Sequence, residues 1–204
     1  MLITQSGETV PIHALGLEID DAETLANELI NNIRANIESI IAVGSQGIVF
    51  QLDNGNVLKV LKTRKTSIQP SLNDYKKMQR RQASGKGSPN EPVVYETGQF
   101  NVSGKKIGYV EMQKLTVLSD VLADKGWNFD DALDELWLEG PKSWSKILVN
   151  HGIPPIVAKC FVDSLKTYIK QTGRNALDEL HSDNVGIIET HDKSKPYVFV
   201  FFDV

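Results

Sequence analysis

The chain has 204 residues, of which 41% are hydrophobic, so it can form one or two domains with a substantial core. Its formal net charge of −4 argues against a nucleic-acid-binding surface as the main function. The apolar runs are too short to span a bilayer, residues 1–17 lack the features of a signal peptide, and the single cysteine, Cys160, permits no internal disulfide. We therefore expect a cytoplasmic protein with no membrane or nucleic-acid partner.

The first expected element is a helix that follows a lead-in of little pattern at residues 1–19. Asp20 and Asp21 can open this helix, because acidic side chains favour a first helical turn. Apolar residues then recur four positions apart and form one stripe: Leu25, Leu29, Ile33 and Ile37. We expect residues 1–38 to be an N-terminal extension whose helix packs on the sheet that follows.

The pattern of residues 41–62 predicts three strands joined by two tight turns. The first turn has the sequence Gly-Ser-Gln-Gly, and the second contains Asn54 and Gly55, which both tolerate positive φ. Backbone N–H groups of a glycine-rich turn can approach an anion, because few side chains stand in the way. The third strand carries Lys59 among apolar residues, where a charge needs a partner.

A helix is expected at residues 72–83, after a polar and basic loop and with Ser71 as its N-cap. Two further strands are predicted at residues 93–102 and 106–113, joined as an antiparallel pair through Ser103 and Gly104. Together these segments predict a five-stranded antiparallel sheet with one helix inserted after its third strand.

The second half of the chain is expected to be mainly helical. Shorter helices are predicted at residues 117–124 and 129–138, and a longer one starts at Pro154-Pro155, where proline suits the first turn. The apolar face of the long helix consists of Val157, Phe161, Leu165 and Ile169. Cys160 lies beside this face, so we expect a buried and unreactive thiol.

Acidic and amide side chains accompany two short apolar segments near the end of the chain. Asp178, Glu179 and Asn184 precede the first segment, and Asp203 follows the second, an apolar strand at residues 199–202.

Four of these features occur in the order typical of the protein-kinase-like superfamily, which the chain resembles over about residues 39–204. Residues 42–49 resemble the glycine-rich pattern GxGxxGxV, with Ala42 in place of the first glycine, and Val57-Leu58-Lys59 resembles the VAIK strand. An acid five residues before Asn184 resembles the catalytic loop, and Asp203 resembles the Asp of DFG, although no Phe-Gly follows it. In scale the chain is similar to the short kinases carried by bacteriophages and to aminoglycoside-phosphotransferase-like enzymes.

The resemblance implies an α+β, protein-kinase-like two-lobe fold. Residues 39–113 would form the N-lobe around the five-stranded antiparallel sheet. Residues 114–204 would form a truncated, mainly helical C-lobe that ends at the DFG-like Asp203. Regulation by phosphorylation of an activation loop would then lie outside this chain.

The resemblance also implies ATP and Mg²⁺ as cofactors. The implied nucleotide-binding residues are Gly44, Ser45, Gln46, Gly47, Val49, Lys59, Asp74, Met112, Gln113 and Leu115. Asp74 takes the place of the helix acid that pairs with the strand lysine, and Met112 borders the adenine pocket at the interlobe hinge. Asn184 and Asp203 would hold the metal.

The implied catalytic residues are Lys59, which neutralises phosphate charge, and an acid that takes the proton of the acceptor hydroxyl. Glu179 holds the position of this acid relative to Asn184, and Asp178 stands next to it. Two classes of function follow. One is an ATP-dependent phosphotransferase, a Ser/Thr protein kinase or autokinase with a protein substrate. The other is a catalytically impaired pseudokinase that binds a nucleotide or a partner protein.

Overall fold

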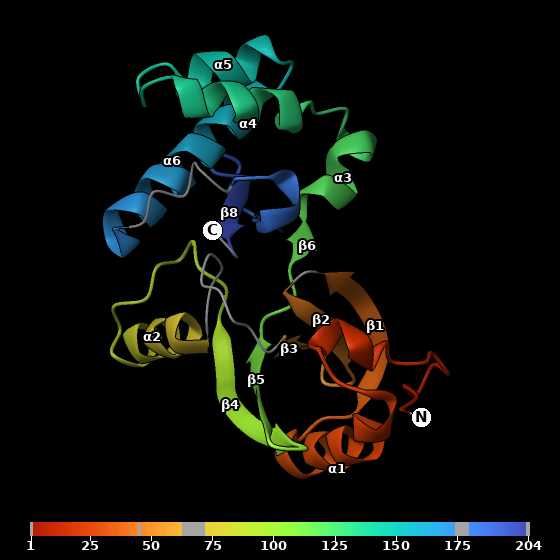
Figure 1. Ribbon diagram of the computed structural model, residues 1–204. Helices are drawn as coiled ribbons and strands as arrows, with labels where there is room; N and C mark the ends of the chain where they lie inside the picture. The colour runs from red at the N-terminus through yellow and green to blue at the C-terminus, as the bar shows by residue number, and fades with distance from the viewer. Residues whose placement is uncertain (1, 45, 63–71, 174–179, 203–204) are drawn as a thin grey trace. The chain divides into compact units, whose positions relative to one another are not determined.

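A five-stranded antiparallel sheet organises the first of two units in the computed structural model, which describes residues 2–44, 46–62, 72–173 and 180–202 (Figure 1). This unit contains Met1–Ser84 and Val93–Lys114. Its strands are β1 (Ile37–Gly44), β2 (Gly47–Leu52), β3 (Val57–Leu61), β4 (Val94–Val102) and β5 (Lys105–Met112), in the spatial order β1-β2-β3-β5-β4. The expectation of an α+β chain with a five-stranded antiparallel sheet is confirmed.

The N-terminal segment covers one face of this sheet. It contains two short 3₁₀ turns, η1 (Ile12–Leu15) and η2 (Ile19–Asp21), and the helix α1 (Ala22–Asn32). Leu25 and Leu29 of α1 join a buried cluster with Phe50 and Leu58 of the sheet. The predicted stripe is wrong at its end, because Ile33 is already extended and Ile37 pairs with Leu52 in β1.

The helix α2 (Leu72–Ala83) covers the opposite face of the sheet. Its apolar residues share a buried cluster with three strands: Val57, Leu72, Tyr75, Met78, Val94, Val110 and Met112. Two glutamines of α2 also bond the edge strand β4. The Gln79 Nε2 donates to the Tyr95 carbonyl at 2.8 Å, and the Val94 N–H donates to Gln82 Oε1 at 3.0 Å. The predicted N-cap, Ser71, lies outside the described residues.

The second unit contains Gly85–Pro92 and Leu115–Val204. Its helices are α3 (Leu118–Lys125), α4 (Phe129–Leu138), α5 (Trp144–Asn150) and α6 (Pro155–Thr172), with a 3₁₀ turn η4 (Ser182–Asn184). Its antiparallel sheet has the order β6 (Thr116–Val117), β7 (Val185–Glu189) and β8 (Tyr197–Phe201). Val117, predicted as helical, instead pairs with Gly186 in β6, and α3 starts one residue later.

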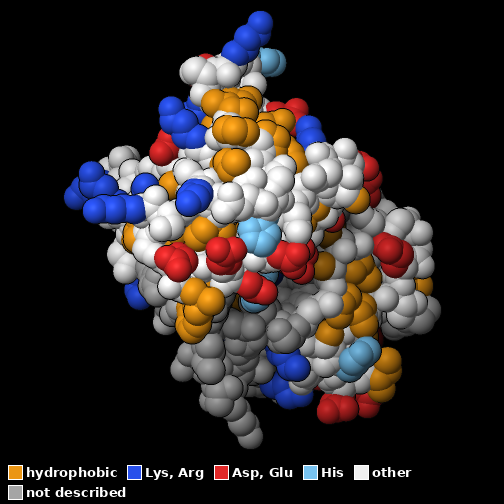
Figure 2. Space-filling model, turned by 90° about the horizontal axis from the view of Figure 1, so that it is seen from above, with side chains coloured by type: hydrophobic (Ala, Val, Ile, Leu, Met, Phe, Trp, Pro, Cys, Tyr) orange, Lys and Arg blue, Asp and Glu red, His pale blue; other side chains and the backbone are white. Residues whose placement is uncertain are grey.

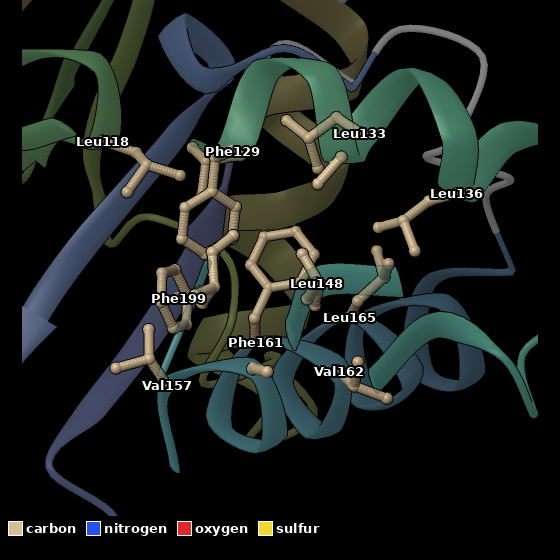
Figure 3. Close-up of a cluster of buried hydrophobic side chains, with 14 of the residues drawn as sticks. Leu118, Phe129, Leu133, Leu136, Leu148, Val157, Phe161, Val162, Leu165 and Phe199 are labelled. Atoms are coloured by element: carbon tan, nitrogen blue, oxygen red, sulfur yellow. The ribbon is translucent and has the colours of Figure 1, made fainter. Parts of the chain in front are cut away.

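Aromatic rings at the centre of the second unit join its helices to β8 (Figure 3). The ring centroid of Phe161 lies 5.1 Å from those of both Phe129 and Phe199. Cys160, on α6, is buried and free, as the sequence predicts. This core fixes β8, the strand that leads to Asp203.

The face seen in Figure 2 carries charges of both signs, interspersed with apolar side chains. The most exposed large apolar residues include Ile19, Ile30 and, at the end of α4, Trp137 and Leu138. None of the described helices combines the length and the hydropathy needed to cross a bilayer.

Candidate functional site

Two rows of side chains cross the sheet face that α2 also covers. Cross-strand partners in an antiparallel sheet point to the same face, as do alternate residues of one strand. The first row runs across β2, β3 and β5 and consists of Val49, Lys59 and Val110. The second row, one step along the same strands, consists of Gln51, Val57 and Met112. Three predicted site residues, Val49, Lys59 and Met112, therefore share one face.

Lys59 is buried, with 6% of its surface exposed, and is bonded to the glycine turn. Its Nζ donates to Gln46 Oε1 at 2.5 Å and to the Tyr75 hydroxyl at 3.4 Å, and it lies 5.9 Å from the centre of the Tyr75 ring. The Gln46 carbonyl accepts the Lys62 N–H at 2.8 Å, which ties the turn to the end of β3. Gln46 and Lys59, two residues predicted to bind nucleotide, are thus in direct contact.

The two glycines of the turn have different structural roles. Gly47 has φ of +144°, and a Cβ at this position would overlap the Val60 carbonyl oxygen of β3. The close approach of β3 therefore requires glycine at position 47. Gly44, its cross-strand partner, has nothing within 4 Å of the position a Cβ would take. The fold does not require glycine at position 44, and Ser45 lies outside the described residues.

Asp74 lies on the first turn of α2 and forms an ion pair with Lys77, with 3.6 Å between Asp74 Oδ1 and Lys77 Nζ. Its side chain is about one quarter exposed. Tyr75, the next residue, reaches Lys59. The pairing of Lys59 with Asp74 stays a prediction.

The three residues predicted at the hinge have separate surroundings. Met112 is buried in the second row, beside Val57. Gln113 donates its backbone N–H to the Val93 carbonyl at 2.8 Å, so this N–H is engaged within the first unit. Leu115 packs over Gly186 in the second unit, where a Cβ at Gly186 would lie 2.9 Å from Leu115 Cβ.

Asn184 closes η4 at the start of β7. Its N–H donates to the His181 carbonyl at 2.9 Å, and its carbonyl accepts the Phe202 N–H at 3.0 Å. This bond joins η4 to Phe202, the last described residue of the chain. Asp203 itself, like Glu179 and Asp178, lies outside the described residues.

A buried asparagine in the connection between α2 and β4 was missed by sequence reasoning. Asn90 donates through Nδ2 to the Phe199 carbonyl at 2.7 Å and accepts the Phe201 N–H at 2.8 Å with its own carbonyl. It is 3% exposed. Asn90 therefore holds the free edge of β8, yet its sequence surroundings, a turn-rich loop, gave no sign of this role.

A second missed residue is Gln51, which occupies the row of Val57 and Met112. Its position carried a signal, because Gln51 interrupts the apolar run of β2 (Gly-Ile-Val-Phe-Gln-Leu). A polar residue at a buried strand position has to find partners.

The described residues contain no group of three or more His, Cys, Asp or Glu side chains that could hold a metal ion. The donors that sequence reasoning assigned to Mg²⁺ are an amide, Asn184, and a carboxylate beyond the described part, Asp203. Amide and carboxylate oxygens fit the donor chemistry of this ion.

The chain matches no protein-family model, and a search of curated proteins finds no match either.

Proposed function

We propose that the chain is an ATP- and Mg²⁺-dependent phosphotransferase of the protein-kinase-like type, acting on Ser/Thr hydroxyls of a protein substrate or of the chain itself. The observation that carries this proposal is the contact between Gln46 and the buried Lys59. A cation held against a glycine-rich turn is an arrangement suited to binding phosphate, because the turn offers backbone N–H groups and the lysine neutralises charge.

Each residue has a role in this proposal. Lys59 binds the phosphates, and the glycine turn covers them and excludes water. Mg²⁺, held by Asn184 and Asp203, would neutralise charge that develops on the phosphate oxygens. Glu179, or its neighbour Asp178, would orient the acceptor hydroxyl and take its proton.

A second candidate is a pseudokinase that binds a nucleotide or a partner protein without turnover. The ion pair between Asp74 and Lys77 favours this candidate, because it engages the acid that the kinase pattern assigns to Lys59. Asp74 is also one methylene shorter than the glutamate usual at this place, so it needs a closer approach of α2.

Two labelled nucleotides test the proposal. Purified chain is incubated with Mg²⁺ and γ-labelled ATP, and separately with α-labelled ATP. Label transferred to protein only from the γ-position supports phosphotransfer, whereas transfer from the α-position indicates nucleotidyl transfer. Binding of Mg²⁺-ATP without transfer of either label supports the pseudokinase.

Lys59→Ala and Lys62→Ala provide a matched pair of variants for this assay. Lys62 is exposed and directly follows β3, the strand that carries Lys59. It therefore controls for loss of a positive charge near the turn. We expect Lys59→Ala to abolish transfer and Lys62→Ala to retain most of it. Equal activity of the two variants would contradict the assignment of Lys59.

A further inference from the structure

Gln51 has a buried carbonyl oxygen that no described residue satisfies. The side chain is 9% exposed, and its Oε1 is the one buried side-chain oxygen or nitrogen in the described part of the chain that has no hydrogen-bond partner. Buried polar groups are nearly always paired in folded proteins, so an unpaired one calls for an explanation.

The orientation of the Gln51 amide is determined by its nitrogen. The Nε2 donates to the Leu52 carbonyl at 2.9 Å and to the Asn56 carbonyl at 3.2 Å. A flipped amide would place oxygen against both carbonyls, which is unfavourable. The unpaired atom is therefore the oxygen, a hydrogen-bond acceptor.

The hairpin does not depend on these two bonds. The Leu52 carbonyl also accepts the Gly55 N–H at 3.1 Å, and the Asn56 carbonyl accepts the Leu52 N–H at 2.9 Å. Both carbonyls keep a backbone donor if the Gln51 amide is removed. The main effect of the two side-chain bonds is therefore to fix the orientation of Oε1, and the turn is held by backbone bonds.

The neighbours of Gln51 in its row across the sheet are apolar. Val57 and Met112 complete its row, and the row of Lys59 lies two residues along the strands, about 7 Å away. Binding sites for small ligands are mostly apolar with a few polar groups that set specificity. A nucleotide whose phosphates meet Lys59 can lay its base along the row of Gln51, because the sugar separates these two parts.

We propose that Gln51 selects the base, its Oε1 accepting a hydrogen bond from the 6-amino group of adenine. This inference rests on the proposed function, which supplies ATP as the ligand. The amino group is the only hydrogen-bond donor on the adenine base of ATP, so it is the complement of a lone acceptor. Oε1 is covered in the unliganded chain, so a side chain on this face has to move to admit the base. Met112, in the same row, has a flexible thioether side chain that suits such a movement.

The test compares ATP with purine riboside triphosphate, which lacks only the 6-amino group. Affinities of both Mg²⁺ complexes are measured by titration calorimetry for the unaltered chain, for Gln51→Met and for Gln99→Met. Methionine matches glutamine in length and has no amide, and Gln99 is an exposed strand glutamine that serves as the control site. Thermal unfolding without ligand checks that all three proteins fold.

The unaltered chain should bind ATP about tenfold more tightly than the analogue, as expected for one hydrogen bond to a buried acceptor. Gln51→Met should remove this preference, because it should lower the affinity for ATP and leave that for the analogue unchanged. Gln99→Met should keep the preference. Equal affinity of the unaltered chain for both nucleotides would overturn the inference without recourse to any variant, as would an undiminished preference in Gln51→Met. If neither nucleotide binds the unaltered chain, the proposed function fails, and this inference fails with it.

Discussion

The sheet face around Lys59 and the loop around Asn184 are held in place by contacts of different range. Two side chains that contact Lys59, those of Gln46 and Tyr75, lie 13 and 16 positions away in the sequence. The strand that follows Asn184 pairs with β8, and β8 is held in turn by Asn90, which is 109 positions from its partner Phe199. The first region thus follows from local hairpins, whereas the second depends on a connection that returns from the other half of the chain.

The largest effect is expected in the region around Lys59, which is built from local hairpins. Gly47→Ala should lower the free energy of unfolding by about 3 kcal/mol or more, because the new Cβ overlaps the Val60 carbonyl and φ is positive. Urea denaturation followed by circular dichroism measures the change. A loss below about 1 kcal/mol would show that β3 can withdraw from the turn without strain.

Asn90→Ala removes the side-chain hydrogen bond between Asn90 and the distant strand β8. It should cost about 2 kcal/mol, because the buried Phe199 carbonyl loses the Nδ2 donor. Asn150→Ala, at an exposed asparagine of the same unit, should change stability by no more than about 0.5 kcal/mol. Hydrogen exchange of the Phe201 amide should also become faster in Asn90→Ala. Unchanged exchange at Phe201 would mean that the edge of β8 does not depend on the side chain of Asn90.

A smaller effect concerns a cross-strand contact in the first unit. Burial, and then the hydrogen bond that the Tyr109 hydroxyl donates to Glu96, raise the pKa of Tyr109 to about 12 from 10.0. Because the folded chain keeps this proton more tightly than the unfolded one, the stabilisation is complete below about pH 10 and is lost as the pH rises through about 12.

Tyr109→Phe removes this titration along with the hydrogen bond. It should cost about 1 kcal/mol at neutral pH, and the deficit relative to the unaltered chain should shrink between about pH 10 and pH 12. Urea titrations of both proteins across this range give the difference directly, so other titrating groups cancel. A deficit that stays constant with pH would contradict the raised pKa of Tyr109.

Sequence reasoning predicted the sheet well because its signals are local. The Asn54-Gly55 turn and the apolar alternation around it specify the register of β2 and β3, and with it the shared face of Val49 and Lys59. It failed at Ile37, because an apolar stripe of helical period does not show where a helix stops. The stripe runs on in the sequence, but Ile37 is extended and pairs with Leu52.

The second region was less predictable for a physical reason. The role of Asn90 depends on β8 arriving beside it, and no pattern within residues 85–92 encodes a partner so distant. Gln51 could have been found, since a glutamine inside an apolar strand is unusual. Only the structure shows, however, that its nitrogen is paired within the hairpin while its oxygen is not.

The smallest expected change in stability is that of Gly44→Ala, a substitution that should affect nucleotide binding but not folding. Gly44→Ala should alter the free energy of unfolding by less than about 0.5 kcal/mol, because its Cβ would meet nothing within 4 Å. If the backbone of the turn approaches phosphate, however, that same methyl group stands in the way, and the affinity for Mg²⁺-ATP should fall about tenfold. Calorimetric titration of Gly44→Ala measures this loss, with Gly140→Ala as the control, because Gly140 also has nothing within 4 Å of a Cβ and does not have a positive φ. A Gly44→Ala variant that folds normally and binds Mg²⁺-ATP as tightly as the unaltered chain would mean that the turn does not contact the phosphates.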